Sequence, residues 1–141
     1  MNANMGQKVS VGHVCVEVSD ITKSRKFYEP VLKSLGFQTI MEERDAFGVR
    51  NGSLSIFLGQ PTSRRVQRKA PDVNEFVVAD HIALLVPDRK TVDEVALTMK
   101  NAGFETLFPA EEHPEFVVGY YSVSFCDPDN NVIEFYVVEK R

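Results

Sequence analysis

The sequence predicts an α+β fold made of two tandem βαβββ modules. The main observation is an internal repeat, in which His13 and Asp20 correspond to His81 and Asp88 at the same offset along the chain. In both halves a strand with alternating apolar residues precedes a helical segment, a glycine and further strand-like stretches. The length of 141 residues suits one domain with a substantial apolar core.

The first half begins with a strand over 11–20 that ends in Asp20, a residue typical of helix starts. A helix is expected over 21–35, and Pro30 inside it predicts a kink or a restart. Gly36 ends this helix, and three strand segments follow. They cover 37–39, 46–50 and 54–59.

The second half repeats this order. A strand over 79–88 ends in Asp88, and the helix over 91–102 begins with a capping box formed by Thr91 and Glu94. Gly103 ends the helix. The strands expected next cover 104–106, 120–126 and 132–138, with the turn residues 127–131 between the last two.

These elements divide the single domain, residues 1–141, into a first module at about 9–60, a linker at about 61–77 and a second module at about 78–139. The linker region is rich in Pro, Arg and Lys. We interpret it as a solvated connection. The alternative is a basic rim that attracts anionic substrates. Its closely spaced basic residues are Arg64, Arg65, Arg68 and Lys69.

Composition excludes several classes of function. The net charge of −4 gives no reason to expect nucleic acid as a partner. Residues 1–8 are polar, unlike a signal peptide, and no stretch approaches the roughly 20 apolar residues of a membrane helix. Cys15 and Cys126 are too few for a disulfide framework. We therefore expect a cytoplasmic protein that acts on small molecules.

Alternation along the predicted strands separates two faces. One face is wholly apolar, so the helices are expected to cover it. The opposite face is polar at its centre, as in a ligand pocket, and carries His13, His81 and Glu134, the lone carboxylate of its strand. A carboxylate on a half-buried sheet is costly unless a cation or another partner compensates it. Candidate pocket residues on the same face are Ser55, Tyr120, Ser122, Ser124 and Tyr136.

The paired modules, the histidine in the first strand of each, and the segments 27–29, 35–37 and 127–134 together resemble the vicinal oxygen chelate superfamily. This superfamily includes glyoxalase I, bleomycin-resistance proteins, methylmalonyl-CoA epimerase, fosfomycin-resistance transferases and extradiol ring-cleaving dioxygenases. The resemblance implies an eight-stranded cup around a divalent metal, and usually a homodimer. The implied metal ligands are His13, His81 and Glu134.

The chemistry of these side chains agrees with the implied site. Two imidazoles and one carboxylate form the triad typical of non-haem iron, and they also suit manganese, nickel, cobalt or zinc. Open metal positions would receive two neighbouring substrate oxygens, and Glu134 would also shuttle a proton. The alternative is that His13 and His81 are structural residues. His113 is expected in an exposed loop, away from the metal.

Departures from the family pattern limit the reaction. Glyoxalase I and the epimerase have a fourth ligand on the last strand of the first module, where the sequence aligns Ser55 with Glu134. Only a bulge that turns Gln60 inward would restore that ligand. Ring-cleaving members have three ligands but keep a tyrosine at the position of Ser124, for which Tyr120 is the nearest substitute.

Two other side chains on the polar face allow two interpretations each. Cys15 is either a thiolate ligand or, as we favour, a small residue that packs in the sheet. Glu17 is either a general base or a solvated rim residue.

Two classes of function follow. The first, which we favour, is a metalloenzyme of the lactoylglutathione lyase or dioxygenase type that binds its substrate through vicinal oxygens. The second is a metal-free protein of the bleomycin-resistance type that sequesters a ligand in the same cup. Metal content separates them, because sequestering members generally lack the metal ligands.

Overall fold

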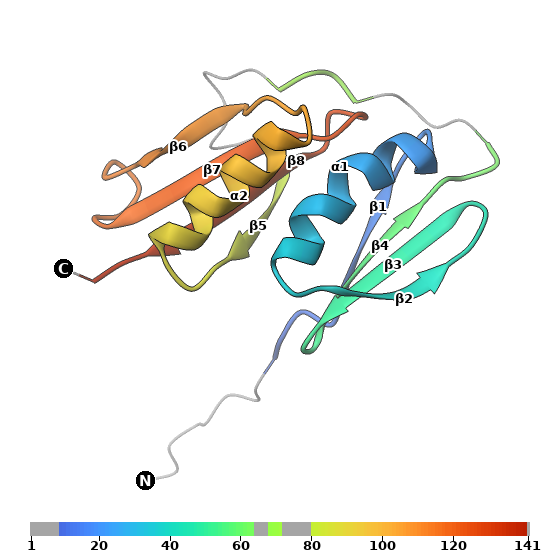
Figure 1. Ribbon diagram of the computed structural model, residues 1–141, viewed down its shortest axis with the longest axis horizontal. Helices are drawn as coiled ribbons and strands as arrows, with labels where there is room; N and C mark the ends of the chain where they lie inside the picture. Colours follow the sequence, from blue (N-terminus) through green and yellow to red (C-terminus); the bar gives the residue numbers. More distant parts are fainter. Residues whose placement is uncertain (1–8, 64–67, 72–79, 141) are drawn as a thin grey trace, which may run out of the picture.

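The computed structural model describes residues 9–63, 68–71 and 80–140, and it has two βαβββ modules in tandem (Figure 1). The predicted fold class is therefore confirmed. The first module consists of β1 (His13–Glu17), α1 (Ile21–Ser34), β2 (Gln38–Glu42), β3 (Ala46–Asn51) and β4 (Leu54–Gly59). The second consists of β5 (His81–Leu85), α2 (Arg89–Asn101), β6 (Phe108–Glu112), β7 (Tyr120–Cys126) and β8 (Val132–Val138).

Each module contains one four-stranded sheet. The strand orders are β1-β4-β3-β2 and β5-β8-β7-β6, so the two sheets have the same topology. The first strand of each module pairs in parallel with the last strand, and the other pairs are antiparallel. The histidine-bearing strands β1 and β5 consequently lie at sheet edges, with one side of each free of a hydrogen-bonded partner among the described strands.

Aspartates cap the N-termini of both helices, as predicted. The Asp20 side chain accepts a hydrogen bond from the Lys23 backbone N–H, and Asp88 does the same for Thr91. The prediction that Thr91 itself caps the second helix is wrong, because α2 begins two residues earlier, at Arg89.

The predicted restart at Pro30 does not occur, because one continuous helix covers Ile21–Ser34; a kink there stays a prediction. Pro30 cannot donate to the carbonyl of Lys26. Lys26 lies on the exposed side of the helix, where water can satisfy that carbonyl.

The strand predicted over 104–106 is also wrong. The chain is not extended into a sheet there, and β6 lies at Phe108–Glu112 instead. Phe104 packs on the core and its ring meets Phe27 of α1 edge-on, at a centroid distance of 5.1 Å. In place of a strand, residues 104–106 thus connect α2 to β6, with Phe104 packed against α1.

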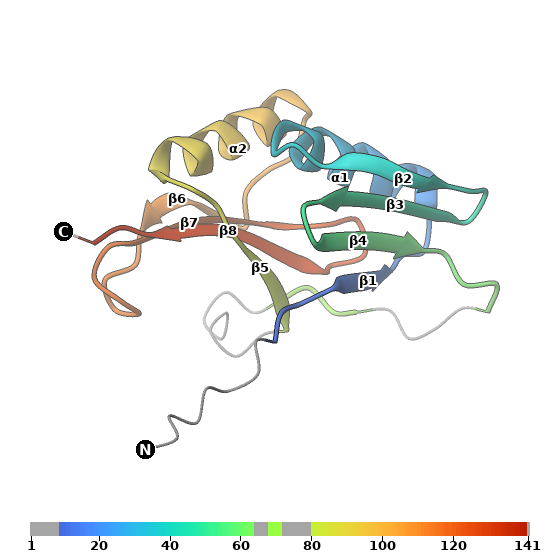
Figure 2. The ribbon, with the colours of Figure 1, turned by 90° about the horizontal axis from the view of Figure 1, so that it is seen from below.

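The helices lie side by side and each covers its own sheet (Figures 1 and 2). The sheet faces toward the helices carry the apolar residues that strand alternation predicted. From β1 and its continuation these are Val14, Val16 and Val18; from β4, Leu54, Ile56 and Leu58; from β5 and its continuation, Ile82, Leu84 and Val86; and from β8, Ile133, Phe135 and Val137. They form one core with the buried side of the helices, so the two modules share their hydrophobic interior.

The turn between β7 and β8 fixes one module on the other. Its buried Asp127 accepts a hydrogen bond of 2.7 Å from the hydroxyl of Tyr28 in α1. Asp129 in the same turn accepts a hydrogen bond of 2.9 Å from the Ser19 backbone N–H. The helix side of the chain is thus held together by polar contacts as well as by the core.

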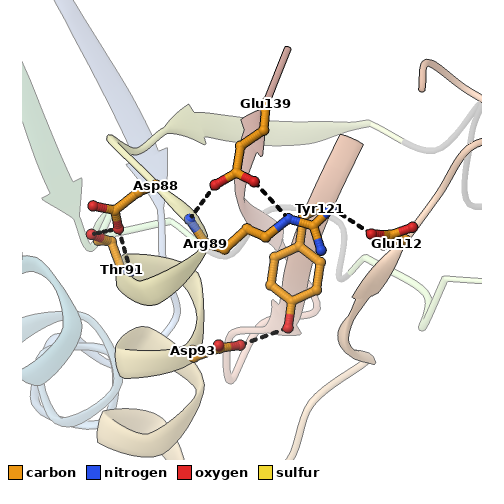
Figure 3. Close-up of polar contacts among 7 residues, drawn as sticks. All are labelled: Asp88, Arg89, Thr91, Asp93, Glu112, Tyr121 and Glu139. Atoms are coloured by element: carbon orange, nitrogen blue, oxygen red, sulfur yellow. Dashed lines mark hydrogen bonds and ion pairs between the residues drawn. The ribbon is translucent and has the colours of Figure 1, made fainter. Parts of the chain in front are cut away.

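A second polar cluster braces α2 against its sheet (Figure 3). The guanidinium of Arg89 forms ion pairs with Glu112 of β6 and, at 2.9 Å, with Glu139 after β8. It also lies over the ring of Tyr121, whose hydroxyl donates to Asp93 of α2. This cluster lies on the helix-covered side of the sheet, so it is separate from the polar face that the sequence singled out.

The predicted linker is described only in part. Arg64 and Arg65 lie outside the described residues, so the predictions for them are untested. Arg68 approaches Asp80 at 3.9 Å, a distance typical of a weak, exposed ion pair. In the described parts of the chain, neither helix combines the length and apolarity that crossing a membrane requires.

Candidate functional site

We use the term open face for the side of each sheet that the helices leave uncovered. The open face of the second sheet carries His81 on β5 and Glu134 on β8, together with side chains from β7. The open face of the first sheet carries His13, Ser55 and Phe57. Predicted site residues thus occur on both open faces.

His81 and Glu134 form the centre of the second open face. The imidazole Nε2 of His81 lies 3.4 Å from the carboxylate Oε2 of Glu134. Cα register places Ala83 directly opposite Glu134, so His81 is its diagonal neighbour on the same face. Glu134 is only 2% exposed, whereas the His81 side chain is 26% exposed. A buried carboxylate oxygen therefore points toward an imidazole that remains accessible from outside.

Tyr120 holds the other oxygen of this carboxylate. Its hydroxyl donates a hydrogen bond to Glu134 Oε1. Burial, reinforced by this hydrogen bond, raises the pKa of the Tyr120 phenol above its ordinary value, so the phenol stays protonated and can donate. The bond leaves Oε2 directed at His81.

Ser124 lies opposite Glu134 in the register of β7 and β8. Its hydroxyl oxygen is buried and has no hydrogen-bond partner among the described residues. Buried hydroxyl groups are normally paired, so an unpaired one beside a carboxylate is typical of a site that takes a ligand or an ordered water.

Aromatic rings extend from Glu134 toward the rim of this face. Tyr136 stacks on Tyr120 with ring centroids 5.1 Å apart and planes 13° apart. Phe116 meets Tyr120 edge-on at 5.6 Å and stacks on His113 at 5.3 Å. We call Phe116, Tyr120 and Tyr136 the aromatic wall. Sequence reasoning missed Phe116, because it lies in a loop where strand alternation gives no information.

His13 is not part of the same cluster within one chain. Across residues 9–63, 68–71 and 80–140, no three His, Cys, Asp or Glu side chains are close enough to hold a metal ion. The structure thus brings two of the three predicted ligands together in the second module and leaves His13 on the first. The assignment of all three as metal ligands stays a prediction.

Phe57, rather than Ser55, occupies the position equivalent to Glu134. His13 pairs with Ser55 in the register of β1 and β4, whereas His81 pairs with Val132 in the register of β5 and β8. The diagonal neighbour of His13 is therefore Phe57, whose ring meets the imidazole at 5.9 Å. The sequence alignment of Ser55 with Glu134 was wrong by two residues, because the turns before β4 and β8 differ in length.

The alternative fourth ligand, Gln60, is turned away from this face. Its Oε1 accepts a hydrogen bond of 2.9 Å from the backbone N–H of Ile21, at the N-terminus of α1. Gln60 thus supplements Asp20 as a cap of α1, and the bulge that would turn it inward is not formed. Because Phe57 occupies the fourth position and Gln60 caps α1, the first module supplies one predicted ligand, His13.

The structure also shows where Cys15, Glu17 and His113 lie. Cys15 and Glu17 are exposed on the open face of β1, so the packing role favoured for Cys15 is wrong within one chain. His113 is in a loop, as predicted, but its side chain is only 15% exposed. Its ring stacks on Phe116 and meets Tyr120 edge-on, which accounts for this burial, and its Nδ1 lies 2.9 Å from Glu115.

The donor atoms available on the open faces fit a divalent metal. An imidazole nitrogen and a carboxylate oxygen already face each other at His81 and Glu134. One further imidazole, such as that of His13, would complete the two-histidine, one-carboxylate set that first-row metals accept. The tyrosine hydrogen bond to the carboxylate is the kind of outer contact that orients a metal ligand.

One family model matches most of the chain. Residues 10–135 match the Glyoxalase/Bleomycin resistance protein/Dioxygenase superfamily. No curated protein sequence matches the chain.

Solved structures share the fold at low sequence identity. A glyoxalase/bleomycin resistance protein from Albidiferax ferrireducens is 20% identical, with a TM-score of 0.73 over 90% of this chain and 98% of that one. A lactoylglutathione lyase from Agrobacterium tumefaciens is 18% identical, with a TM-score of 0.67 over 94% and 96%. The fosfomycin resistance protein FosX from Listeria monocytogenes is 21% identical, with a TM-score of 0.67 over 92% and 93%.

Proposed function

Because the chain belongs to the Glyoxalase/Bleomycin resistance protein/Dioxygenase superfamily, we propose that it is a metal-dependent enzyme whose active site forms between two copies. His81 and Glu134 of one copy and His13 of the other would hold the ion. The observation that carries this proposal is the pair formed by His81 Nε2 and Glu134 Oε2 on an uncovered sheet face. The substrate is a small molecule bound through two neighbouring oxygens.

Exposure of the open faces supports a site between copies. In one chain the side chains of β1 that face away from the helices are all exposed, including His13. On β5 the same holds for Leu85, which is 68% exposed, and the His81 side chain is partly exposed. In a homodimer that brings two such faces together, Leu85 would be buried. His13 of one copy would then lie near His81 and Glu134 of the other.

The residues around His81 and Glu134 have distinct roles in this proposal. When bound, the metal would stabilise negative charge that develops on two neighbouring substrate oxygens. Glu134 is the group that we assign to proton transfer, in addition to binding the ion. Tyr120 orients Glu134, and Ser122, Ser124 and Tyr136 line the space beside it.

Phe57 bears on the type of reaction. At the position equivalent to Glu134 the first module offers an aromatic ring, which neither binds a cation as a ligand nor accepts a proton. This favours chemistry with three protein ligands, as in ring-cleaving dioxygenases, over glyoxalase-type isomerisation with a second carboxylate. The three ligands leave coordination positions for the substrate.

A second candidate is metal-free sequestration of a ligand, as in bleomycin-resistance proteins. The aromatic wall favours it, since Phe116, Tyr120 and Tyr136 offer a stacking surface that does not depend on a metal. In that case the contact between His81 and Glu134 would be structural. Purified protein would then contain no bound metal, and His81→Ala would not change its metal content.

Subunit complementation tests the favoured proposal. His13→Ala and Glu134→Ala are each expected to lose bound cobalt in titrations of the purified protein. In a mixed dimer, His13 of the Glu134→Ala chain and Glu134 of the His13→Ala chain would form one intact site. Differently tagged chains, purified as a heterodimer, should therefore regain about half of the wild-type metal content.

Glu94→Ala is the control, because Glu94 is an exposed carboxylate on α2, on the helix side of the sheet. It should bind cobalt like the wild type. A heterodimer that binds no more cobalt than either single variant would contradict a site shared between copies.

A further inference from the structure

Arg50 lies in the same row of the first open face as His13. Cα register pairs His13 of β1 with Ser55 of β4, and Ser55 with Arg50 of β3. The three residues are therefore neighbours across three adjacent strands. Arg50 is exposed, and its strand neighbour Val49 packs in the core on the opposite side. The arginine side chain thus belongs to the face that carries a predicted metal ligand.

Ser55 anchors the arginine. The Nε–H of Arg50 donates a hydrogen bond of 3.0 Å to Ser55 Oγ, and Ser55 is only 3% exposed. One edge of the guanidinium is thereby fixed to the sheet, while the hydrogen bond leaves its two terminal nitrogens available. Fixing a long side chain in this way reduces the entropy that ligand binding would otherwise cost.

In the described part of the chain, Arg50 is charged but not ion-paired. Arg25, Arg68 and Arg89 each lie within ion-pair distance of a carboxylate, whereas Arg50 shares with the exposed Arg44 the lack of such a partner among the described residues. No carboxylate of the described residues lies within such a distance of Arg50. An anchored guanidinium without an acidic partner is suited to an anion from outside the chain.

A hollow adjoins this arginine. It has a volume of about 350 Å³ and opens on the surface between β2 and the turn that joins β3 to β4. It is lined by Gly36, Gln38, Ile40, Arg50, Asn51 and Gly52. The lining combines one cation, two amides and an apolar side chain, so it offers room for part of an organic molecule.

We infer that Arg50, held by Ser55, binds a carboxylate group of the substrate. This inference rests on the proposed function, because it takes His13 as the neighbouring metal ligand. Two strand spacings separate the backbones of His13 and Arg50, about 10 Å. The substrate class is thus a small organic acid whose carboxylate lies several bonds away from the two oxygens that face the metal.

The planar fork of the guanidinium explains the preference for carboxylate. Two parallel N–H groups match the two oxygens of a carboxylate, which a lysine ammonium cannot do. Ser55, predicted as a pocket residue, acts here by positioning Arg50.

Fluorine NMR with 4-fluorobenzoate tests the inference on the metal-free full-length protein. We expect concentration-dependent broadening of its signal by the wild type and no broadening of uncharged 4-fluorobenzamide. Arg50→Gln should weaken the binding of 4-fluorobenzoate by about tenfold or more, because a charge-assisted hydrogen-bond pair is lost. Arg50→Lys, which keeps the charge but not the fork, should also bind more weakly than the wild type.

Arg44→Gln is the matched control, because it changes the net charge by the same amount as Arg50→Gln. Arg44 lies in an exposed turn between β2 and β3. It should bind the probe like the wild type. Equal binding by Arg50→Gln and the wild type would overturn the inference, as would equal binding of the amide or tighter binding of inorganic phosphate in competition.

The same samples separate this inference from the proposed function. Loss of cobalt binding in His81→Ala concerns the metal site, whereas loss of 4-fluorobenzoate binding in Arg50→Gln concerns the carboxylate subsite. His81→Ala should still bind 4-fluorobenzoate, because His81 lies on the other sheet. Circular dichroism of each variant verifies that it is folded.

Discussion

At the scale of single residues, the carboxylate of Glu134 is unusual because it is buried without a full set of donors. Tyr120 donates to one oxygen and His81 approaches the other at 3.4 Å. Burial of a charge that is only partly compensated is costly, so the sheet gives up stability at this position. That cost is what we expect of a residue kept for binding.

Tyr120→Phe should weaken metal binding without unfolding the protein. Removing the hydroxyl frees Oε1 of Glu134 and lets the carboxylate rotate. Loss of such an outer contact typically lowers metal affinity by about 10- to 100-fold. Calorimetric titration with cobalt measures the change.

Tyr121→Phe is its matched control, because Tyr121 is the next residue but its hydroxyl donates to Asp93 on the helix side. It should leave cobalt affinity unchanged. If both variants bind cobalt as the wild type does, Tyr120 has no part in holding the ligand.

Tyr28 and Asp127 account for stability rather than function. Besides the Tyr28 hydroxyl, Asp127 accepts hydrogen bonds from the backbone N–H groups of Asp129 and Asn131 and from the Asn131 amide. Tyr28→Phe would remove one donor from a buried carboxylate. We expect a loss of about 1–3 kcal/mol in the free energy of unfolding, measured by urea denaturation at pH 7.

Burial of Tyr28 also predicts that the free energy of unfolding decreases at alkaline pH. Burial, followed by the charge of Asp127, raises the pKa of Tyr28 well above its ordinary value near 10. Above pH 10 the phenol ionises in the unfolded chain but not in the folded one, so the unfolded state is favoured as pH rises. The contribution of Tyr28 is full below pH 10 and decreases above it.

Urea denaturation at several pH values between 8 and 11 measures this effect. Above pH 10 the wild type should lose about 1.4 kcal/mol per pH unit more than Tyr28→Phe. Parallel pH profiles for the two proteins would contradict a neutral, buried Tyr28.

At the scale of elements, the N-terminus of α1 is capped twice. Asp20 accepts from the Lys23 N–H, and Gln60, from the residue after β4, accepts from the Ile21 N–H. The helix that packs against the second module is thereby tied to the last strand of its own sheet. Capping in this region thus affects the orientation of α1 as well as its stability.

Substitution of either cap should lower stability but leave metal binding intact. Asp20→Ala is expected to cost about 1 kcal/mol in the free energy of unfolding, and Gln60→Ala should also be destabilising. Asp45→Ala, which removes the same charge from an exposed turn, is the control for Asp20→Ala. A loss of bound cobalt in Gln60→Ala would show that Gln60 reaches the metal after all.

Sequence reasoning succeeded at this scale where the signal was local. Alternation in β1, β4, β5 and β8 identified the helix-covered faces, and Asp20 and Asp88 marked both helix starts. It failed at β6, which begins at Phe108 rather than directly after Gly103, while Phe104 packs against Phe27 of α1. It also failed at Thr91, because Asp88, three residues earlier, caps the helix instead.

At the scale of the whole molecule, the chain packs its two modules through their helices and leaves both open faces uncovered. Two exposed leucines lie on opposite sides of the second module. Leu85 is on the open face of β5, whereas Leu97 is on α2. A homodimer that joins open faces would bury the first and leave the second exposed.

Leu85→Glu should therefore disrupt the dimer and reduce cobalt binding while the monomer stays folded. The wild type is expected to have twice the chain mass of 15.9 kDa in light scattering after gel filtration. Leu97→Glu adds the same charge at a position 57% exposed, and it should remain dimeric and bind cobalt. A Leu85→Glu protein that stays dimeric would contradict this interface.

The sequence alone determined the βαβββ repeat, the two faces of each sheet and the set of polar residues on the open faces, because these follow from periodicity within each segment. Tertiary structure decided what depends on contacts between segments. Strand register put Phe57 rather than Ser55 at the fourth position, and pairing of β5 with β8 brought His81 to Glu134, whereas the packing of the two modules left His13 apart from that pair. Periodicity fixes which side of a strand a residue faces, but register and packing between modules depend on turn lengths and on contacts distant in sequence.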